Sequence, residues 1–464
     1  MALRLKSRPR YRRRVGAFSG LDVKHDESVI NFSTAKTCYN FDFSSGALRD
    51  GYGIQSDVDV PKEATAFWIY RYYSEDAGRY VEQYLYQYAG VLRYYDEYTG
   101  KLRFINGNPF PPITAINYRL NSKDVLLMSC EGHRLISWNG KNLVEYATSP
   151  VISSMALHYE RLFVTSPEES TKVYFSQNLD PTNWNLSSTE GGFIELLDDR
   201  GALNKVVSFA NYLYIFRDHG ISRVTAYGDQ SDFSVTNLFV SAGRIYPESI
   251  VKCGACIVFL ASDGLYVFDG YECVRALKNL DGLIVGGAKA SAYHNGKYYL
   301  SCRMDFGDGK EIGCESGEFE ANALLVFDPS SGEYSLSRGL DIRFLGACSY
   351  LKRDFLAAYE KSAGGGTVVQ NGAVLDNPLP KMWKSGTTDF SAPDKTKALR
   401  ELYVTSATDC TVCVDTGKKQ KTLSVKAGSR RLRLNTNCKE FSLEIACGQS
   451  GVNIRPPTVI YSTY

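Results

Sequence analysis

The chain has 464 residues with a formal net charge of +2; 44% of the residues are hydrophobic, 13% are aromatic and 32 are tyrosines. This length predicts two domains, or one large repetitive domain with additions, and the aromatic content favours strands. No apolar run approaches the length of a membrane helix and no secretory signal opens the sequence, so neither a membrane protein nor a secreted one is expected.

The net charge hides a strong segregation along the chain. Residues 1–14 carry seven basic residues and no acidic one, residues 381–464 carry 14 basic and 7 acidic residues, and residues 15–380 carry 32 basic and 44 acidic residues. Such asymmetry indicates contact with a partner or with nucleic acid near the two ends. The basic residues of the first segment are Arg4, Lys6, Arg8, Arg10, Arg12, Arg13 and Arg14.

Residues 1–60 are expected to form an extended basic arm and a lead-in. Three interpretations of the arm remain open. It neutralises DNA phosphates, it docks on an acidic protein surface such as the acidic middle segment of a neighbouring copy, or it is a disordered tail with no specific role.

Residues 61–380 contain short apolar runs separated by Gly, Asn and Asp, a pattern that favours strands over helices. Two strands followed by a hairpin recur along this segment, and four strands in each interval of about 40–50 residues are typical of propeller blades. The sequence therefore predicts an all-β protein with a β-propeller of about seven four-stranded units. The hairpins are expected to begin near Val91, Leu135, Val173, Ile221, Leu265, Leu325 and Thr367.

The third hairpin contains the turn Asp180-Pro181-Thr182-Asn183, followed by Trp184. Pro181 presets the φ angle of a turn, and Asp180 or Asn183 can accept hydrogen bonds from backbone N–H groups. Residues 173–176 are expected to form the inner strand of this hairpin and residues 184–186 its outer strand, with Trp184 packed against a neighbouring unit. We interpret these residues as a structural turn.

After two prolines, residues 381–464 are expected to form a separate small β-sandwich. Its predicted strands are Leu399–Ser406, Thr411–Asp415, Lys421–Val425, Ser429–Leu434 and Phe441–Ala446.

Twelve cysteines are scattered over the chain and are expected to be free thiols that act as small core residues. Cys253 with Cys256, and Cys410 with Cys413, have the spacing of two halves of a zinc site. Each pair lies in or beside a predicted strand, where residues i and i+3 point to opposite faces. We therefore predict no metal and no cofactor.

No motif identifies a catalytic acid, base or nucleophile, so no catalytic residue is predicted and the chain is not expected to be an enzyme. Tyrosines cluster in the first propeller unit, where they either line a glycan groove or form cross-strand and interface pairs, and the second interpretation is favoured. They are Tyr70, Tyr72, Tyr73, Tyr80, Tyr84, Tyr86, Tyr88, Tyr94, Tyr95 and Tyr98.

Three stretches resemble the β-propeller tail proteins of tailed bacteriophages, the nozzle or tail hub components of short-tailed phages. They are residues 20–53, residues 161–185 with the Asp-Pro-x-Asn-Trp turn, and residues 262–270 together with the opening of the terminal module at residues 381–390. The resemblance covers most of the chain.

This resemblance implies a non-enzymatic structural subunit of the virion tail that folds and assembles in the host cytoplasm. It would form a ring, of six copies, around the channel for genome ejection, beside portal, adaptor or other tail proteins. Genomic DNA would pass without sequence-specific binding, which an acidic lumen would favour, and no membrane contact is implied. The alternative is a glycan-binding or carbohydrate-active β-propeller.

Overall fold

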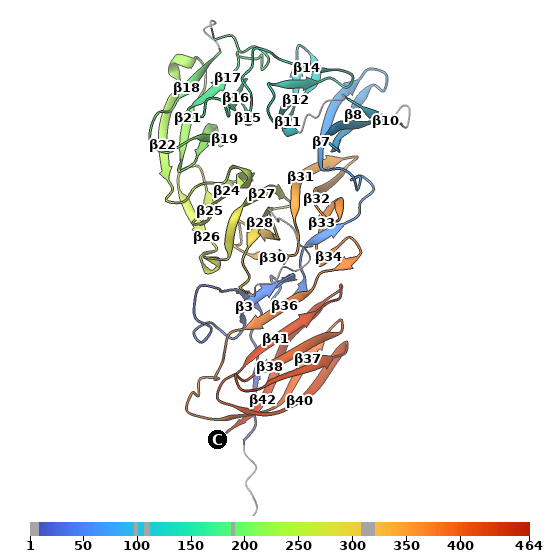
Figure 1. Cartoon of the computed structure of the whole chain (residues 1–464), viewed down its shortest axis with the longest axis vertical. Helices are drawn as coiled ribbons and strands as arrows, with labels where there is room; N and C mark the ends of the chain where they lie inside the picture. Colours follow the sequence, from blue (N-terminus) through green and yellow to red (C-terminus); the bar gives the residue numbers. More distant parts are fainter. Residues whose placement is uncertain (1–8, 97–100, 106–111, 187–190, 308–320) are drawn as a thin grey trace, which may run out of the picture.

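The computed structural model describes residues 9–96, 101–105, 112–186, 191–307 and 321–464. Within these ranges the chain forms strands β1 to β42 and three short 3-10 helices, η1 (Gln230–Asp232), η2 (Pro247–Ser249) and η3 (Lys278–Leu280). Figure 1 shows two bodies along the long axis, a ring of small sheets and a β-sandwich beyond it. The predicted all-β class, with a propeller and a C-terminal sandwich, is confirmed.

In the described residues the ring consists of seven blades, and six of them are antiparallel sheets of four strands in the order of the predicted repeat. Blade 1 contains β7 (Ala66–Ser74), β8 (Arg79–Tyr88), β9 (Val91–Asp96) and β10 (Lys101–Phe104). Blade 2 contains β11 (Pro112–Leu120), β12 (Lys123–Cys130), β13 (Ile136–Trp138) and β14 (Leu143–Glu145). Blade 3 contains β15 (Ser154–His158), β16 (Arg161–Thr165), β17 (Lys172–Phe175) and β18 (Gly192–Glu195). Blade 4 contains β19 (Leu203–Phe209), β20 (Tyr212–Arg217), β21 (Gly220–Thr225) and β22 (Ser234–Val240). Blade 5 contains β23 (Val251–Cys253), β24 (Cys256–Ala261), β25 (Gly264–Phe268) and β26 (Cys273–Ala276). Blade 6 contains β27 (Ile284–His294), β28 (Lys297–Met304), β29 (Ala323–Phe327) and β30 (Tyr334–Arg338).

Blade 7 is completed by a strand from the other end of the chain. Its strands β31 (Ile342–Tyr350), β32 (Arg353–Glu360) and β33 (Gly364–Val369) are followed by β6 (Gly53–Gln55), which pairs antiparallel with β33. The short strands β34 (Ala373–Val374) and β35 (Asn377–Pro378) extend this sheet. The predicted hairpin after Thr367 is therefore wrong as the source of the fourth strand, because β6 occupies that edge and closes the ring.

Apolar clusters lie between neighbouring blades all around the ring, which explains why these short strands form a stable unit. Blades 1 and 2 share Tyr70 and Leu126, blades 3 and 4 share Phe163 and Leu213, and blades 7 and 1 share a further cluster. The cluster between blades 5 and 6 is continuous with the core of the sandwich, which includes Trp383. The two bodies therefore share one core.

The sandwich consists of two six-stranded sheets, and each contains strands from both ends of the chain. The first sheet contains β4 (Phe41–Asp42), β5 (Leu48–Asp50), β42 (Asn453–Thr463), β37 (Lys397–Ser406) and β40 (Gly428–Cys438), with β1 (Tyr11–Arg14) also paired to β42. The second contains β2 (Ser19–Leu21), β3 (Thr34–Tyr39), β36 (Lys381–Ser385), β41 (Ser442–Cys447), β38 (Cys410–Asp415) and β39 (Gln420–Val425). Residues 11–55, expected as a separate arm and lead-in, are thus built into both domains.

Buried polar contacts fix the sandwich to the propeller. The Tyr334 hydroxyl in blade 6 donates to the Leu21 carbonyl at 2.9 Å and accepts from the Leu21 N–H at 2.6 Å. The Lys381 ammonium, whose side chain is fully buried, donates to the carbonyls of Gln449 at 2.7 Å and Gly372 at 3.2 Å and lies 3.4 Å from the Asp50 carboxylate. The junction is therefore specified by directional bonds as well as by apolar packing.

Candidate interaction surface

The predicted basic arm forms an edge strand of the first sandwich sheet. Strand β1 pairs antiparallel with β42, with Arg12 opposite Ile460 and Arg14 opposite Thr458. Across β42 and β37, the same register reaches β40, where Arg431 lies opposite Tyr403 and Arg433 opposite Glu401. Since alternate residues of a strand share a face, the arginines of both chain ends lie on one side of this sheet.

We call this side the arginine face. It contains Arg12, Arg14, Arg431, Arg433 and Arg455, all of them exposed. The local sequence explains the arrangement, because the run Arg431-Leu432-Arg433-Leu434 alternates and its leucines point toward the core. Arg455 joins the face from β42, opposite Thr405.

Glu401 is the acidic side chain within the arginine face. It accepts hydrogen bonds from Arg431 Nε at 3.0 Å and from the Tyr403 hydroxyl at 3.1 Å. The hydrogen bond from Arg431 is the main cause that lowers the pKa of Glu401, and the charge of Arg10 also contributes. Arg10 therefore lies close to the same face, which carries a surplus of guanidinium groups suited to carboxylates or phosphates.

The other predicted arm residues are placed differently. Arg13 points away from the arginine face and its guanidinium lies 6.0 Å from the centre of the Phe390 ring. Arg4, Lys6 and Arg8 lie outside the described residues. Sequence reasoning missed Arg431, Arg433 and Arg455; the Arg-Leu alternation in β40 was the available signal.

The predicted turn residues of the third blade hold the chain between β17 and β18. Asp180 accepts hydrogen bonds from the Thr182 N–H at 3.0 Å and hydroxyl at 2.6 Å, and the side-chain oxygen of Asn183 accepts from the Asn185 N–H at 3.1 Å. The turn residue Pro181, which precedes Thr182, is buried. These residues lie in a turn, as the sequence predicts.

The outer strand predicted at residues 184–186 is wrong, since the outer strand of this blade is β18 (Gly192–Glu195). Trp184 is instead buried between blades 2 and 3, beside residues such as Leu127 and Leu162. Its indole therefore packs blade 3 against the neighbouring blade 2.

The strands nearest the propeller axis are β7, β11, β15, β19, β23, β27 and β31 (Figure 1). None of these described strands contains Asp or Glu. They do carry the cations Arg71, Arg119, Lys205, Lys252, Lys289 and Arg343. The acidic residues of the propeller therefore lie on its outer strands and connecting turns.

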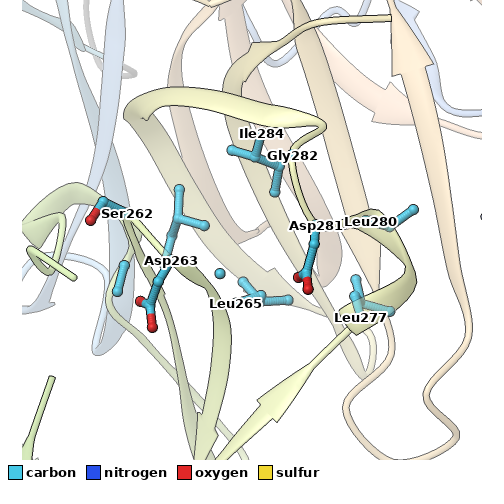
Figure 2. Close-up of a pocket in the computed structure, with 11 residues that line it drawn as sticks. Ser262, Asp263, Leu265, Leu277, Leu280, Asp281, Gly282 and Ile284 are labelled. Carbon is cyan, nitrogen blue, oxygen red and sulfur yellow. The ribbon is translucent and has the colours of Figure 1, made fainter. Parts of the chain in front are cut away.

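A small cavity in blade 5 brings two carboxylates together. Figure 2 shows Asp263 and Asp281 on two sides of this cavity, with Leu265 between them. Its volume is about 110 Å³, and Asp281 binds Lys24 at 3.0 Å and Arg275 at 2.8 Å. The Tyr266 hydroxyl donates to Asp263 at 2.6 Å. Because Lys24 belongs to the N-terminal segment, Asp281 helps to attach that segment to blade 5.

The two Cys-x-x-Cys pairs lie in different bodies. Cys253 and Cys256 face each other at the end of the β23–β24 hairpin, whereas Cys410 and Cys413 lie in β38 of the sandwich.

Two further cysteines, Cys273 and Cys302, lie outside these pairs, the first half-buried and the second buried. Burial raises the pKa of each thiol to about 12, so both are protonated at neutral pH. In the described part of the chain, no cluster of three or more His, Cys, Asp or Glu side chains is arranged to hold a metal ion.

Within the described ranges, no helix has the length and apolarity needed to cross a membrane. The topology defines the chain as a seven-bladed β-propeller joined to a β-sandwich that carries an exposed arginine face. No protein-family model matches the sequence, and no curated protein matches it.

Similar solved structures include BBS1N in complex with ARL6DN, in a crystal soaked with lead, with 11% identity and a TM-score of 0.44 over 68% of this chain and 97% of that one. The same complex soaked with mercury gives 10% identity and a TM-score of 0.43. The extracellular domain of the putative one-component system BT4673 from B. thetaiotaomicron has 10% identity and a TM-score of 0.43, over 94% of this chain and 64% of that one.

Proposed function

We propose that this protein is a structural subunit of a bacteriophage tail that assembles with copies of itself into a ring around the path of the genome. The observation that carries this proposal is the arginine face, in which both basic ends of the chain meet on one exposed sheet. Residues 15–380, which include all of the propeller strands, carry 32 basic and 44 acidic residues. A basic face on one body and an acidic surplus on the other favour heterologous contacts between copies, and such contacts form a ring when the rotation from one copy to the next closes.

The ring contact would place the arginine face against the outer, acidic surface of a neighbouring propeller. The absence of acidic residues from the axis strands supports this arrangement, because it leaves the carboxylates on the outer strands and turns. Six copies, portal or adaptor neighbours and a location in the virion tail belong to the same proposal, and they rest on the resemblance of residues 20–53, 161–185, 262–270 and 381–390.

Native mass spectrometry and electron microscopy of the full chain at low and high salt test the assembly. The double variant Arg12→Glu/Arg14→Glu should lose the ring, since a contact between desolvated charges contributes about 1.5 kcal/mol or more per pair. The matched control Lys418→Glu/Lys419→Glu reverses two exposed charges on the turn between β38 and β39 of the second sheet and should assemble like the wild type.

Antibody labelling of phage particles should place the protein in the tail. Equal assembly of both variants would remove the arginine face from the contact. A monomer at all salt concentrations that hydrolyses glycosides would contradict the proposed class.

A further inference from the structure

A second feature of the sandwich does not depend on ring assembly. Beside strand β1 lies a polar cavity of about 510 Å³, within the range of about 300–1,000 Å³ that is typical of ligand sites. Three segments far apart in the sequence meet there: residues 13–16, the loop 28–33 and the loop 387–391, with Glu440 beside them.

The loop at 387–391 holds a strained turn against this cavity. Phe390 and Ser391 have φ angles of 51° and 59°, in the left-handed region that a bulky side chain rarely adopts. The Ala392 N–H closes the turn on the Asp389 carbonyl at 3.2 Å, and Asp389 Oδ1 accepts from the Ser391 N–H at 2.7 Å. Asn-Gly is the usual sequence for such a turn, so Phe390 occupies this position at a cost in free energy.

Aromatic contacts hold Phe390 in this conformation. Its ring lies 4.7 Å from that of Tyr461, 5.2 Å from that of Phe441 and 5.9 Å from that of Phe32, measured between ring centres. Both Phe32 and Phe390 line the cavity and are only partly buried. Backbone strain that is maintained by surrounding packing clusters at ligand sites.

The polar groups of the cavity are balanced between donors and acceptors. Arg13 supplies guanidinium donors and Thr387 and Ser391 supply hydroxyl groups, whereas Asp389 and Glu440 supply carboxylate acceptors; the Arg14 side chain lies on the opposite side of β1, on the arginine face. Within the described part of the chain, the Glu440 carboxylate and the Thr387 hydroxyl make no hydrogen bond. These groups are therefore available to a ligand.

We propose that this cavity is a binding site for a neutral saccharide. A sugar hydroxyl both donates and accepts, which suits guanidinium, carboxylate and hydroxyl groups in one cavity. The apolar face of a sugar ring carries polarised C–H groups that pack on the negative face of an aromatic ring, here Phe32 or Phe390. A phosphate or a polyanion fits less well, because Asp389 and Glu440 would repel it.

The test uses the full chain and the oligosaccharides maltotriose, cellotriose, chitotriose and mannotriose, each at up to about 10 mM. Saturation-transfer NMR should detect binding of at least one of them, and titration calorimetry should give an affinity that changes little with salt, since a neutral ligand is not screened. Asp389→Asn removes the carboxylate charge and keeps an oxygen that can accept from the Ser391 N–H. Glu440→Gln removes the carboxylate charge at an exposed position.

Each of these two variants should weaken binding about tenfold, the effect of losing a charged hydrogen bond. The matched control Glu272→Gln, on the exposed turn of blade 5, should bind like the wild type. Equal thermal unfolding of all the variants establishes that the fold is retained. The proposal would be overturned if every oligosaccharide failed to bind, if Asp389→Asn and Glu440→Gln bound as tightly as the wild type, or if inorganic phosphate bound in a salt-sensitive way in place of the oligosaccharides.

Discussion

Acidification should destabilise the propeller through one buried histidine. His158 ends the inner strand of blade 3 and is 2% exposed, and its Nδ1 lies 2.9 Å from the Ser208 hydroxyl of blade 4. Its Nε2 is buried without a hydrogen-bond partner among the described residues. Burial therefore lowers the pKa of His158 to about 4, from its ordinary value of 6.5.

The unfolded chain binds a proton at this site between pH 6.5 and about 4, whereas the folded chain does not. Stability at this site is therefore complete above pH 6.5 and is lost as the pH falls toward about 4, by up to about 3 kcal/mol. The variant His158→Asn retains a side chain that can bond to Ser208 and does not titrate.

Urea unfolding of both proteins over this pH range measures the effect. The free energy of unfolding of the wild type should fall more steeply than that of His158→Asn, by up to about 3 kcal/mol in total. Parallel curves for the two proteins would refute the assignment, because His158 would then titrate alike in the folded and unfolded states.

Two further predictions concern packing. Trp184→Ala should lower the free energy of unfolding, measured by calorimetry, by about 3–5 kcal/mol, because the indole is buried between blades 2 and 3. The control Leu179→Ala lies on the same turn, at a side chain that is 64% exposed, and should change this free energy by less than about 0.5 kcal/mol. Lys381→Ala should cost about 3 kcal/mol and loosen the two domains, seen as faster proteolysis at the junction, because it removes the ion pair with Asp50 and the hydrogen bonds that the buried ammonium donates to backbone carbonyls. The exposed Lys439→Ala should have no such effect.

Much of the propeller could be predicted because each blade repeats a local pattern. The third strand of every blade begins within three residues of its predicted hairpin start, from Val91 in β9 to Thr367 in β33. Turn signals and alternation act between residues close in sequence, and six of the blades are built from consecutive strands. The fourth strand of the seventh blade could not be predicted, because β6 and β33 are separated by about 300 residues and no pattern in the nearby sequence indicates that they pair.

The arginine face could be predicted only in part. The basic character of both ends is visible in composition, but the pairing of β1 with β42 is a contact between the two ends of the chain. Strands β36 and β42 were also missed, since β36 directly follows Pro380 and β42 contains Pro456 and Pro457, and prolines weaken a strand pattern. The contact of Trp184 with a neighbouring blade was predicted, but the outer strand at residues 184–186 was wrong, because an apolar residue after a turn suggests a new strand whereas the fourth strand is β18.

The N-terminal segment links the two halves of the molecule in a way that bears on the proposed assembly. Residues 11–50 supply five strands to the sandwich, and residues 53–55 supply the strand that closes blade 7. Neither body therefore has complete sheets without this segment, and exposed edges would remain in both. Since Arg12 and Arg14 lie on the first strand of the same segment, the arginine face is complete only when that segment has joined the sandwich, and the propeller closes only when β6 has paired. A chain therefore completes its arginine face and its propeller only when the N-terminal segment has joined both bodies. In the proposed assembly, this dependence would keep partly folded chains out of the ring.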